Sequence, residues 1–173
     1  MKSLDGKPLP AGLYLVATPI GNLRDISLRA LEVLGAVDLV ACEDTRVTGK
    51  LLQAHSLKKK MMSYNDHNAD QRRTPILDAV EAGQAVALVS DAGMPLISDP
   101  GYKMVREAVQ RDLMVTSIPG ANAALCALQL SALPSDAFCF IGFLPPKTTA
   151  RKKVLQGWAS VPATLIFYES APR

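Results

Sequence analysis

The sequence predicts an α/β protein in which helices flank a mostly parallel sheet, followed by the beginning of a second α/β domain. Short, continuous apolar runs rich in valine recur along the 173 residues, the pattern of strands that are buried on both faces of a parallel sheet. Segments with helical apolar spacing alternate with these runs. Loops that contain glycine and proline follow several runs, at the carboxyl ends where open α/β sheets bind ligands.

The composition is that of a globular protein with a substantial core. Hydrophobic residues make up 49% of the chain and charged residues 20%, and the net charge is only +3. No apolar run reaches the roughly 20 residues of a membrane span, and the first residues lack the apolar core of a signal peptide. We therefore expect a cytoplasmic protein without a membrane partner. Cys42, Cys126 and Cys139 are scattered, so we expect buried thiols and no metal rather than a disulfide framework or a zinc site.

The first predicted strand covers residues 13–17 and ends in the loop 18–22, Thr-Pro-Ile-Gly-Asn. Apolar residues at helical spacing over residues 28–34 predict a helix, with Asp25 or Ser27 as its N-cap. The loop lacks the G-x-G-x-x-G fingerprint of dinucleotide-binding folds.

The second predicted strand, residues 37–42, runs directly into the charged sequence 43–46, Glu-Asp-Thr-Arg. One interpretation is a helix N-terminus with Asp44 as N-cap and Glu43 near the positive end of the helix dipole. The other is a functional group of charges at the crevice of the sheet. Both interpretations stay open, and they are compatible.

A short third strand at residues 61–63 leads into a polar cluster at residues 64–68, Tyr-Asn-Asp-His-Asn. His67 is either a base presented to a substrate or a structural residue of a turn. Residues 69–83 predict a helix, which either begins just before Pro75 or is kinked there.

The longest predicted strand-to-helix loop lies in the middle of the chain. Residues 85–89 predict a buried strand, and about eight loop residues follow, where strand-to-helix connections usually take about two to six. This loop includes Asp91, and Ser98-Asp99-Pro100 predicts the start of a helix over residues 101–110. We expect a ligand-binding loop; a plain turn is the alternative.

A further strand at residues 114–118 is followed by another Pro-Gly loop and a helix over residues 123–130. Parallel strands bring their carboxyl ends to the same edge of a sheet. The loops after the strands 13–17, 85–89 and 114–118 are therefore expected to line one site with backbone groups.

The last part predicts a strand at 138–143, a Pro-Pro linker at 144–149, a helix at 150–159 and a strand at 164–168. We therefore expect an N-terminal α/β domain over residues 1–143, a linker over 144–149 and the start of a second α/β domain over 150–173. One helix and one strand cannot bury a core, so we expect this chain to be a fragment or truncated.

Seven sequence blocks lie at or near these strand ends: ATPIGNLRDIS at 17–27, ACEDTR at 41–46, YNDHN at 64–68, LVSDAGMPLISDPG at 88–101, IPGANA at 118–123, GFLPPK at 142–147 and FYES at 167–170. Together they resemble the tetrapyrrole methylase superfamily, the class III S-adenosylmethionine-dependent methyltransferases. Within it, the likeness is to the members that methylate small-subunit ribosomal RNA.

The resemblance implies transfer of a methyl group from S-adenosylmethionine to the ribose 2′-hydroxyl of a cytidine in the decoding region of 16S ribosomal RNA. It also implies a homodimer, with the small ribosomal subunit as partner and the cofactor in a cleft between two domains. By matching positions, the implied cofactor contacts are Ile20, Gly21, Asp91, Met94, Ile97, Asn122, Ala123, Tyr168 and Glu169.

The reaction needs a group that takes the proton of the hydroxyl and cations that hold RNA phosphates. The candidates for the base are Asp44, Asp66 and His67. The candidates for RNA binding are Arg24, Arg46, Lys147, Arg151, Lys152 and Lys153, and Tyr64 or Phe143 is expected to stack on a base. The alternatives are a methyltransferase of the same superfamily acting on a tetrapyrrole or a protein, and a non-catalytic module that binds a nucleotide or RNA.

Overall fold

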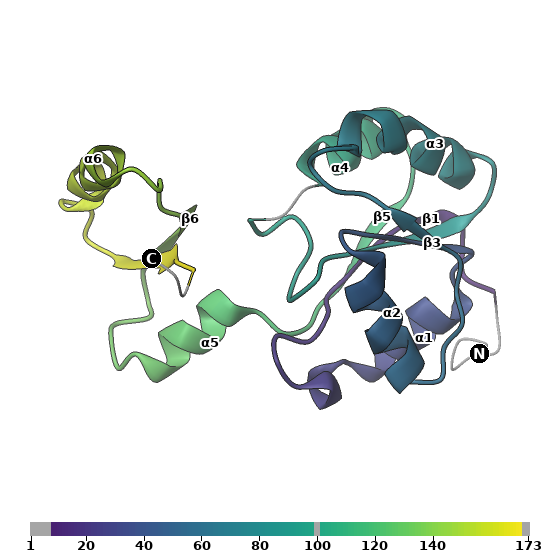
Figure 1. The fold of residues 1–173 in the computed structure, drawn as a ribbon, viewed down its shortest axis with the longest axis horizontal. Helices are drawn as coiled ribbons and strands as arrows, with labels where there is room; N and C mark the ends of the chain where they lie inside the picture. Colours follow the sequence, from purple (N-terminus) through teal and green to yellow (C-terminus); the bar gives the residue numbers. More distant parts are fainter. Residues whose placement is uncertain (1–7, 99–100, 171–173) are drawn as a thin grey trace. The chain divides into compact units, whose positions relative to one another are not determined.

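The computed structural model describes residues 8–98 and 101–170. The chain divides into two compact units, residues 1–121 and residues 122–173. The first unit contains a five-stranded sheet with the strand order β3-β2-β4-β1-β5 (Figure 1). Its strands are β1 (Gly12–Val16), β2 (Leu39–Cys42), β3 (Met61–Ser63), β4 (Ala85–Val89) and β5 (Val115–Ile118). All four strand pairings are parallel, so the predicted parallel sheet is confirmed.

Helices cover both faces of this sheet, as Figure 1 shows. They are the short 3-10 helix η1 (Leu23–Asp25) and the helices α1 (Leu28–Ala36), α2 (Thr45–Ala54), α3 (Ala69–Glu81) and α4 (Tyr102–Gln110). The helices α1 and α2 lie on one face, and α3 and α4 lie on the other. Every residue of β2 and β4 is buried, as expected for strands covered on both faces.

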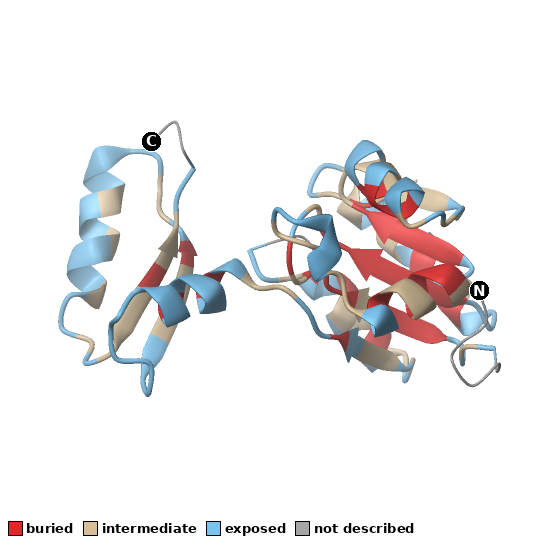
Figure 2. Ribbon diagram, turned by 90° about the horizontal axis from the view of Figure 1, so that it is seen from below, coloured by how far each residue is buried: buried red, intermediate tan, exposed pale blue. Residues whose placement is uncertain are grey.

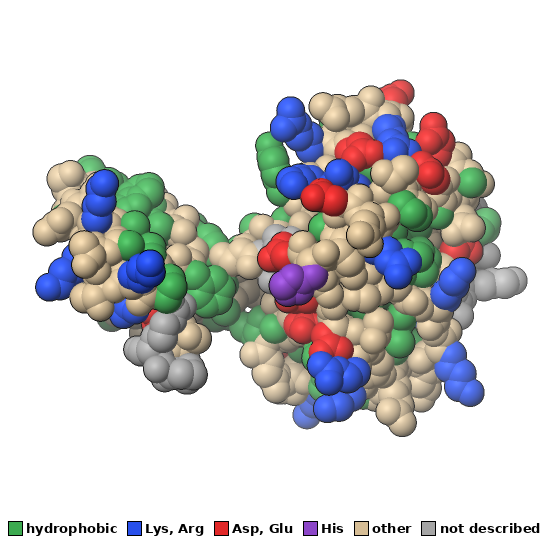
Figure 3. Space-filling view, turned by 45° about the horizontal axis from the view of Figure 1, so that its top comes forward, with side chains coloured by type: hydrophobic (Ala, Val, Ile, Leu, Met, Phe, Trp, Pro, Cys, Tyr) green, Lys and Arg blue, Asp and Glu red, His purple; other side chains and the backbone are tan. Residues whose placement is uncertain are grey.

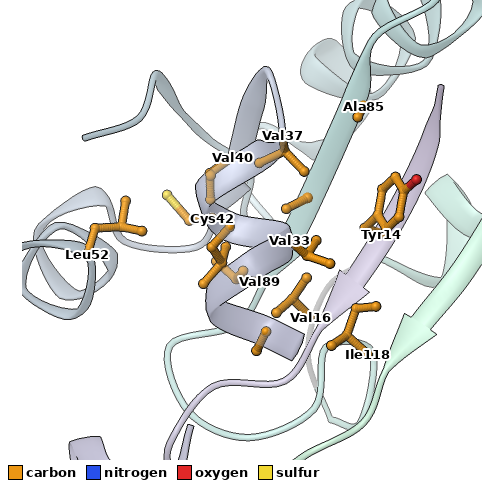
Figure 4. Packing of buried hydrophobic residues seen from close by; sticks show 13 residues of the cluster. Tyr14, Val16, Val33, Val37, Val40, Cys42, Leu52, Ala85, Val89 and Ile118 are labelled. Atoms are coloured by element: carbon orange, nitrogen blue, oxygen red, sulfur yellow. The ribbon is translucent and has the colours of Figure 1, made fainter. Parts of the chain in front are cut away.

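Two hydrophobic clusters form the core, one on each face of the sheet. Successive side chains of a strand point to opposite faces. Val40 and Cys42 of β2 therefore pack with α1 and α2, while Leu39 and Ala41 pack with α3 and α4. Figure 4 shows the first cluster, in which Val33 of α1 lies among the strand side chains. Figure 2 shows the buried strands of the first unit in red, whereas β3 and most of β5 are less buried.

Two N-caps follow the sequence prediction. The Ser27 hydroxyl accepts a hydrogen bond from the Ala30 N–H at 3.1 Å, so Ser27 rather than Asp25 caps α1. The Asp44 side chain caps α2 by accepting the Arg46 N–H at 2.8 Å. In both cases the cap satisfies an N–H group that has no partner inside the helix.

Two other helix starts differ from the prediction. Helix α3 begins at Ala69 and continues through Pro75, so a start just before Pro75 is wrong. Helix α4 has Gly101 as its N-cap residue, and Ser98 has a φ of +63°, which is outside the extended conformation of an N-cap. Asp99 and Pro100, the rest of the predicted cap, lie outside the described residues.

The second unit contains α5 (Ala123–Leu130), β6 (Phe138–Phe143), α6 (Thr148–Trp158) and β7 (Thr164–Tyr168). Strands β6 and β7 form a parallel two-stranded sheet, and α5 packs against it through Ala124, Leu128 and Ile166. The composition places the domain boundary at 144–149, whereas the contacts divide this chain after Ala121. The reason is that β6 pairs with β7, so α5 and β6 group with the later residues.

The three cysteines do not share one environment. Cys42 is buried, Cys139 is intermediate and Cys126 is exposed, so the prediction of buried thiols holds only for Cys42. Within the described residues, no helix combines the length and the hydrophobicity that crossing a membrane requires.

The two leucines at opposite ends of α1 give a matched test of the core. Leu34 is 1% exposed and Leu28 is 77% exposed. Leu34→Ala removes buried side-chain volume and is expected to lower the free energy of unfolding by about 2–5 kcal/mol. Leu28→Ala is expected to change it by less than about 0.5 kcal/mol, as is usual at the surface. Urea denaturation followed by circular dichroism measures both, and equal losses would contradict this packing.

Candidate functional site

The loops after β1 and β4 are joined through their backbones at the carboxyl edge of the sheet. The Thr18 N–H donates to the Gly93 carbonyl at 2.9 Å, and the Gly93 N–H donates back to the Thr18 carbonyl at 3.1 Å. The buried Thr18 hydroxyl also donates to the Ser90 carbonyl at 3.1 Å. These three hydrogen bonds join the two loops to each other.

Glycines let a third loop, after β5, approach the same place. A Cβ on Gly120 would lie 2.9 Å from the Cβ of Ala17, closer than real Cβ atoms come. A Cβ on Gly93 would lie 3.3 Å from Cγ2 of Ile20 and 3.5 Å from the Ala121 carbonyl oxygen. The predicted convergence of these three loops is thus confirmed up to Ala121.

A second group of strand ends forms an open polar pocket of about 390 Å³, which we call the β2–β4 pocket. It is lined by Glu43, Asp44, Thr45, Arg46, Ser63, Asn65, His67 and Asp91. The fold therefore brings Asp44 and His67, two of the three candidate bases, together with Arg46. Asp66 is exposed and is not among the lining residues. Figure 3 shows acidic side chains gathered beside a histidine on one face of the first unit.

Asp44 is engaged by Arg46 within this pocket. Arg46 Nη2 donates to Asp44 Oδ2 at 2.6 Å, in addition to the backbone cap. These hydrogen bonds, the side-chain ones first, lower the pKa of Asp44 to about 2. A carboxylate with so low a pKa is a weak proton acceptor near neutral pH.

His67 is held by a network of asparagines. Its backbone N–H donates to Oδ1 of Asn65 at 3.2 Å, and the Asn65 N–H donates to Oδ1 of Asn68 at 2.9 Å. Both amide side chains also donate to the Ser63 hydroxyl. Tyr64, in contrast, is 1% exposed within the core, so the expectation that it stacks on a base is wrong. The sequence Tyr-Asn-Asp-His-Asn shows no periodicity that would mark Tyr64 as buried.

A second hollow is lined by the loop after β1 and by helix α2. This cavity of about 330 Å³ is called the α2 cavity here, and it falls within the ~300–1,000 Å³ range of ligand pockets. Its lining residues are Thr18, Pro19, Gly21, Leu23, Val47, Thr48, Lys50, Leu51, Ser90 and Asp91. Asp91 borders both hollows, and its Oδ1 accepts the Asp44 N–H at 3.1 Å.

The remaining candidate cofactor contacts belong to both units. Ile20, Met94 and Ile97 lie in the loops of the first unit, where the Ile97 N–H donates to the Met94 carbonyl at 3.4 Å. In the second unit, the Asn122 side chain caps α5 by accepting the Leu125 N–H, and Ala123 is the first residue of that helix. The other two candidates are Tyr168, whose ring packs edge-on against Phe140 and Phe143, and the exposed Glu169.

The candidate RNA-binding cations differ in their exposure and in their hydrogen bonds within the chain. Arg24, Lys147, Lys152 and Lys153 are exposed. The Arg151 guanidinium instead donates to the Pro145 and Pro146 carbonyls, at 3.2 and 3.0 Å. On the face that Figure 3 shows, lysine and arginine side chains are spread over both units.

Residues 12–173 match the family described as tetrapyrrole (corrin/porphyrin) methylases. The chain belongs to the tetrapyrrole methylase family. It is 53% identical over 170 residues to "Ribosomal RNA small subunit methyltransferase I" of Mesorhizobium japonicum, covering 98% of this chain and 58% of that protein. The protein of the same name from Escherichia coli O157:H7 is 52% identical over 161 residues, covering 93% of this chain and 56% of that protein. The chain therefore spans somewhat more than half the length of these curated relatives.

The fold of this methylase chain is also that of a solved diphthine synthase. The two align with a TM-score of 0.71 and 18% identity, over 92% of this chain and 65% of that one. At this identity the likeness concerns the fold alone, and it agrees with the predicted fold class.

Sequence reasoning missed the α2 cavity. Val47, Leu51 and Leu52 recur at helical spacing, which indicates a helix but not which of them faces a cavity. In the methylase chain, Leu51 and Leu52 are buried, while Val47 is 40% exposed and lines the cavity. Periodicity cannot distinguish a residue that faces the core from one that faces a cavity beside it.

Gly93→Ala tests the junction of the loops. Gly93 has a φ of +85° and a tight approach to Ile20, so we expect the alanine variant to lose about 1–2 kcal/mol of unfolding free energy. Gly49→Ala is the control, because its added Cβ has only an ordinary contact at 3.7 Å and lies inside α2. The control is expected to gain up to about 1 kcal/mol. Urea denaturation measures both, and a Gly93→Ala variant as stable as the native chain would contradict the junction.

Arg46→Gln tests the charge pairing in the β2–β4 pocket. Removing the guanidinium is expected to raise the pKa of Asp44 from about 2 toward its ordinary value of 3.8. The pKa stays below that value, because the N–H of residue 46 still donates to the carboxylate. Carbon-detected NMR titration of the Asp44 carboxyl measures the change. An unchanged pKa would show that Arg46 does not hold the carboxylate.

Proposed function

We propose that the whole protein transfers a methyl group from S-adenosylmethionine to the ribose 2′-hydroxyl of a cytidine in the decoding region of 16S ribosomal RNA. The observation that carries the proposal is the convergence of three backbone-rich loops at one sheet edge. It occurs in a tetrapyrrole methylase chain about half identical to small-subunit ribosomal RNA methyltransferases. The same proposal implies a cytoplasmic protein, since its substrate is in the ribosome, and we further propose a homodimer.

The residues at this edge fit a cofactor that is held mainly by main-chain groups. Gly120 is exposed and Gly93 is buried, and at both positions an added Cβ would crowd the neighbouring loop. The residues of the first unit that would hold S-adenosylmethionine are Ile20, Gly21, Asp91, Met94 and Ile97; the family resemblance adds Asn122, Ala123, Tyr168 and Glu169 as candidate contacts. When bound, this cofactor supplies an already activated methyl group.

The chain must then take the proton of the ribose hydroxyl. Asp44 is poorly suited, because Arg46 and the helix cap lower its pKa to about 2. His67 lines the same pocket, and imidazole is an effective general base near neutral pH. We infer that His67 is the base and keep its exposed neighbour Asp66 as the second candidate.

The RNA backbone would be held outside the β2–β4 pocket. Glu43, Asp44 and Asp91 give this pocket more negative than positive charge, and Arg46 is already paired with Asp44. A phosphate is therefore better placed on the exposed cations Arg24, Lys147, Lys152 and Lys153. Arg151 instead positions the Pro-Pro segment through its two carbonyl contacts.

Transfer of a labelled methyl group tests the substrate. The whole protein is incubated with labelled S-adenosylmethionine and, in separate reactions, small ribosomal subunits, protein-free ribosomal RNA and porphyrin precursors. We expect label in the small subunits, at the 2′-O of a cytidine. Label found only in a porphyrin or a protein would show that the substrate is one of these molecules and not ribosomal RNA. Absence of S-adenosylmethionine binding in calorimetry would leave a non-catalytic binding module.

His67→Asn tests the proposed base, and Asp66→Asn is the matched comparison in the same loop. We expect His67→Asn to lower kcat by about 10²–10⁴-fold, the usual contribution of a general base, with the cofactor Kd unchanged. Asp66→Asn is expected to retain most of the activity. The opposite result would assign the proton transfer to Asp66, and a pH-rate profile of each variant checks which group titrates.

A further inference from the structure

The α2 cavity is built differently from the polar pocket beside it. Pro19, Leu23, Val47 and Leu51 form apolar walls. Leu23 is 47% exposed and Val47 is 40% exposed, so two large apolar side chains face solvent at this hollow. Apolar surface left exposed around a concave site is typical of a place where a ligand or partner binds.

Two of the polar residues that line the same cavity, Thr18 and Ser90, donate hydrogen bonds to backbone carbonyls. The Thr18 hydroxyl donates to the Ser90 carbonyl, and the Ser90 hydroxyl donates to the Gly93 carbonyl at 3.2 Å. Because both hydroxyl protons are already donated to carbonyls, the Thr18 and Ser90 oxygens can serve an occupant only as hydrogen-bond acceptors. The cavity thus suits an occupant that is flat and apolar on its faces and carries a few donors on its edge, as a nucleobase does.

Most of the proposed cofactor contacts in the first unit do not line this cavity. Ile20 packs toward Gly93 on one side of the loop, whereas Pro19, Gly21 and Leu23 line the cavity on the other. Thr18, which is bridged to Gly93, lines the cavity. Of the proposed cofactor contacts in the first unit, Gly21 and Asp91 border the cavity, whereas Ile20, Met94 and Ile97 do not.

Asp91 connects the cavity to the pocket that contains His67. It lines both hollows and is held by the Asp44 N–H. A nucleotide with its base in the α2 cavity would carry its ribose toward this border, next to the pocket of the proposed base. Lys50 lines the same cavity and is exposed, so it offers a cation to an adjacent phosphate.

We propose that the α2 cavity receives the unstacked base of the nucleotide whose ribose is methylated. The inference rests on the proposed function and adds the place where the substrate base is anchored. A base held at Leu23 and Val47 would also hold the ribose that is attached to it. Holding the ribose hydroxyl in place lowers the barrier of the displacement reaction.

Filling the cavity tests the inference in the whole protein. Val47→Trp places a large ring at the cavity from α2, and Leu23→Trp does so from η1. Ala54→Trp is the matched control, because Ala54 is exposed at the end of α2 and does not line this cavity. The readouts are kcat/KM for small ribosomal subunits and the Kd of S-adenosylmethionine measured by calorimetry.

We expect Val47→Trp and Leu23→Trp each to lower kcat/KM by about ten- to hundredfold, the usual range for losing one base contact. The cofactor Kd stays within about twofold of the native value, which also shows that the variants are folded, and Ala54→Trp behaves like the native protein. Native kcat/KM in both cavity variants overturns the inference. So does a cofactor Kd weakened as much as kcat/KM, because the cavity would then belong to the cofactor.

The wild-type reaction separates this inference from the proposed function. If the wild-type protein methylates small subunits and the filled variants do so equally well, only the cavity assignment falls. If the wild-type protein binds S-adenosylmethionine but methylates no ribosomal RNA, the proposed function falls and the cavity assignment falls with it.

Discussion

Two backbone hydrogen bonds between Thr18 and Gly93 join the loops after β1 and β4, and the candidate site depends on this junction. Neighbouring parallel strands deliver their ends to one edge of a sheet, but they do not by themselves bring the following loops into contact. The backbones of two loops can meet only where no side chain stands between them. Gly93 and Gly120 meet this requirement, since a Cβ at either position would press against the neighbouring loop.

Among the side chains, Asp91 also joins two elements of the candidate site. Its carboxylate accepts the Asp44 N–H and so ties the end of β4 to the start of α2. Asp91 lines both the α2 cavity and the β2–β4 pocket. A division between an apolar cavity and a polar pocket suits a reaction in which one part of the substrate is gripped and another is chemically changed, because the two tasks need different environments.

The sheet and most helices follow directly from local sequence. The apolar runs at β2 and β4 became fully buried parallel strands, and Ser27 became an N-cap, because burial on two faces and capping each leave a local signature. Predictions went wrong where long-range packing decides. Of the two alternatives for Pro75, the helix start just before it is wrong, and Tyr64 packs in the core rather than facing a substrate. Pairing of β6 with β7 places the division between the units after Ala121 rather than at 144–149.

The sequence by itself determined the parallel α/β architecture, the family and the loops that carry the candidate residues, because strand burial, turn chemistry and sequence blocks are local properties of the chain. The tertiary structure decided which of those residues share a hollow. It placed His67 beside Arg46 and Asp91, bound the Asp44 carboxylate to Arg46, and turned Val47 toward a cavity. These outcomes depend on how elements distant in the sequence pack together, and neither residue spacing nor composition encodes that packing locally.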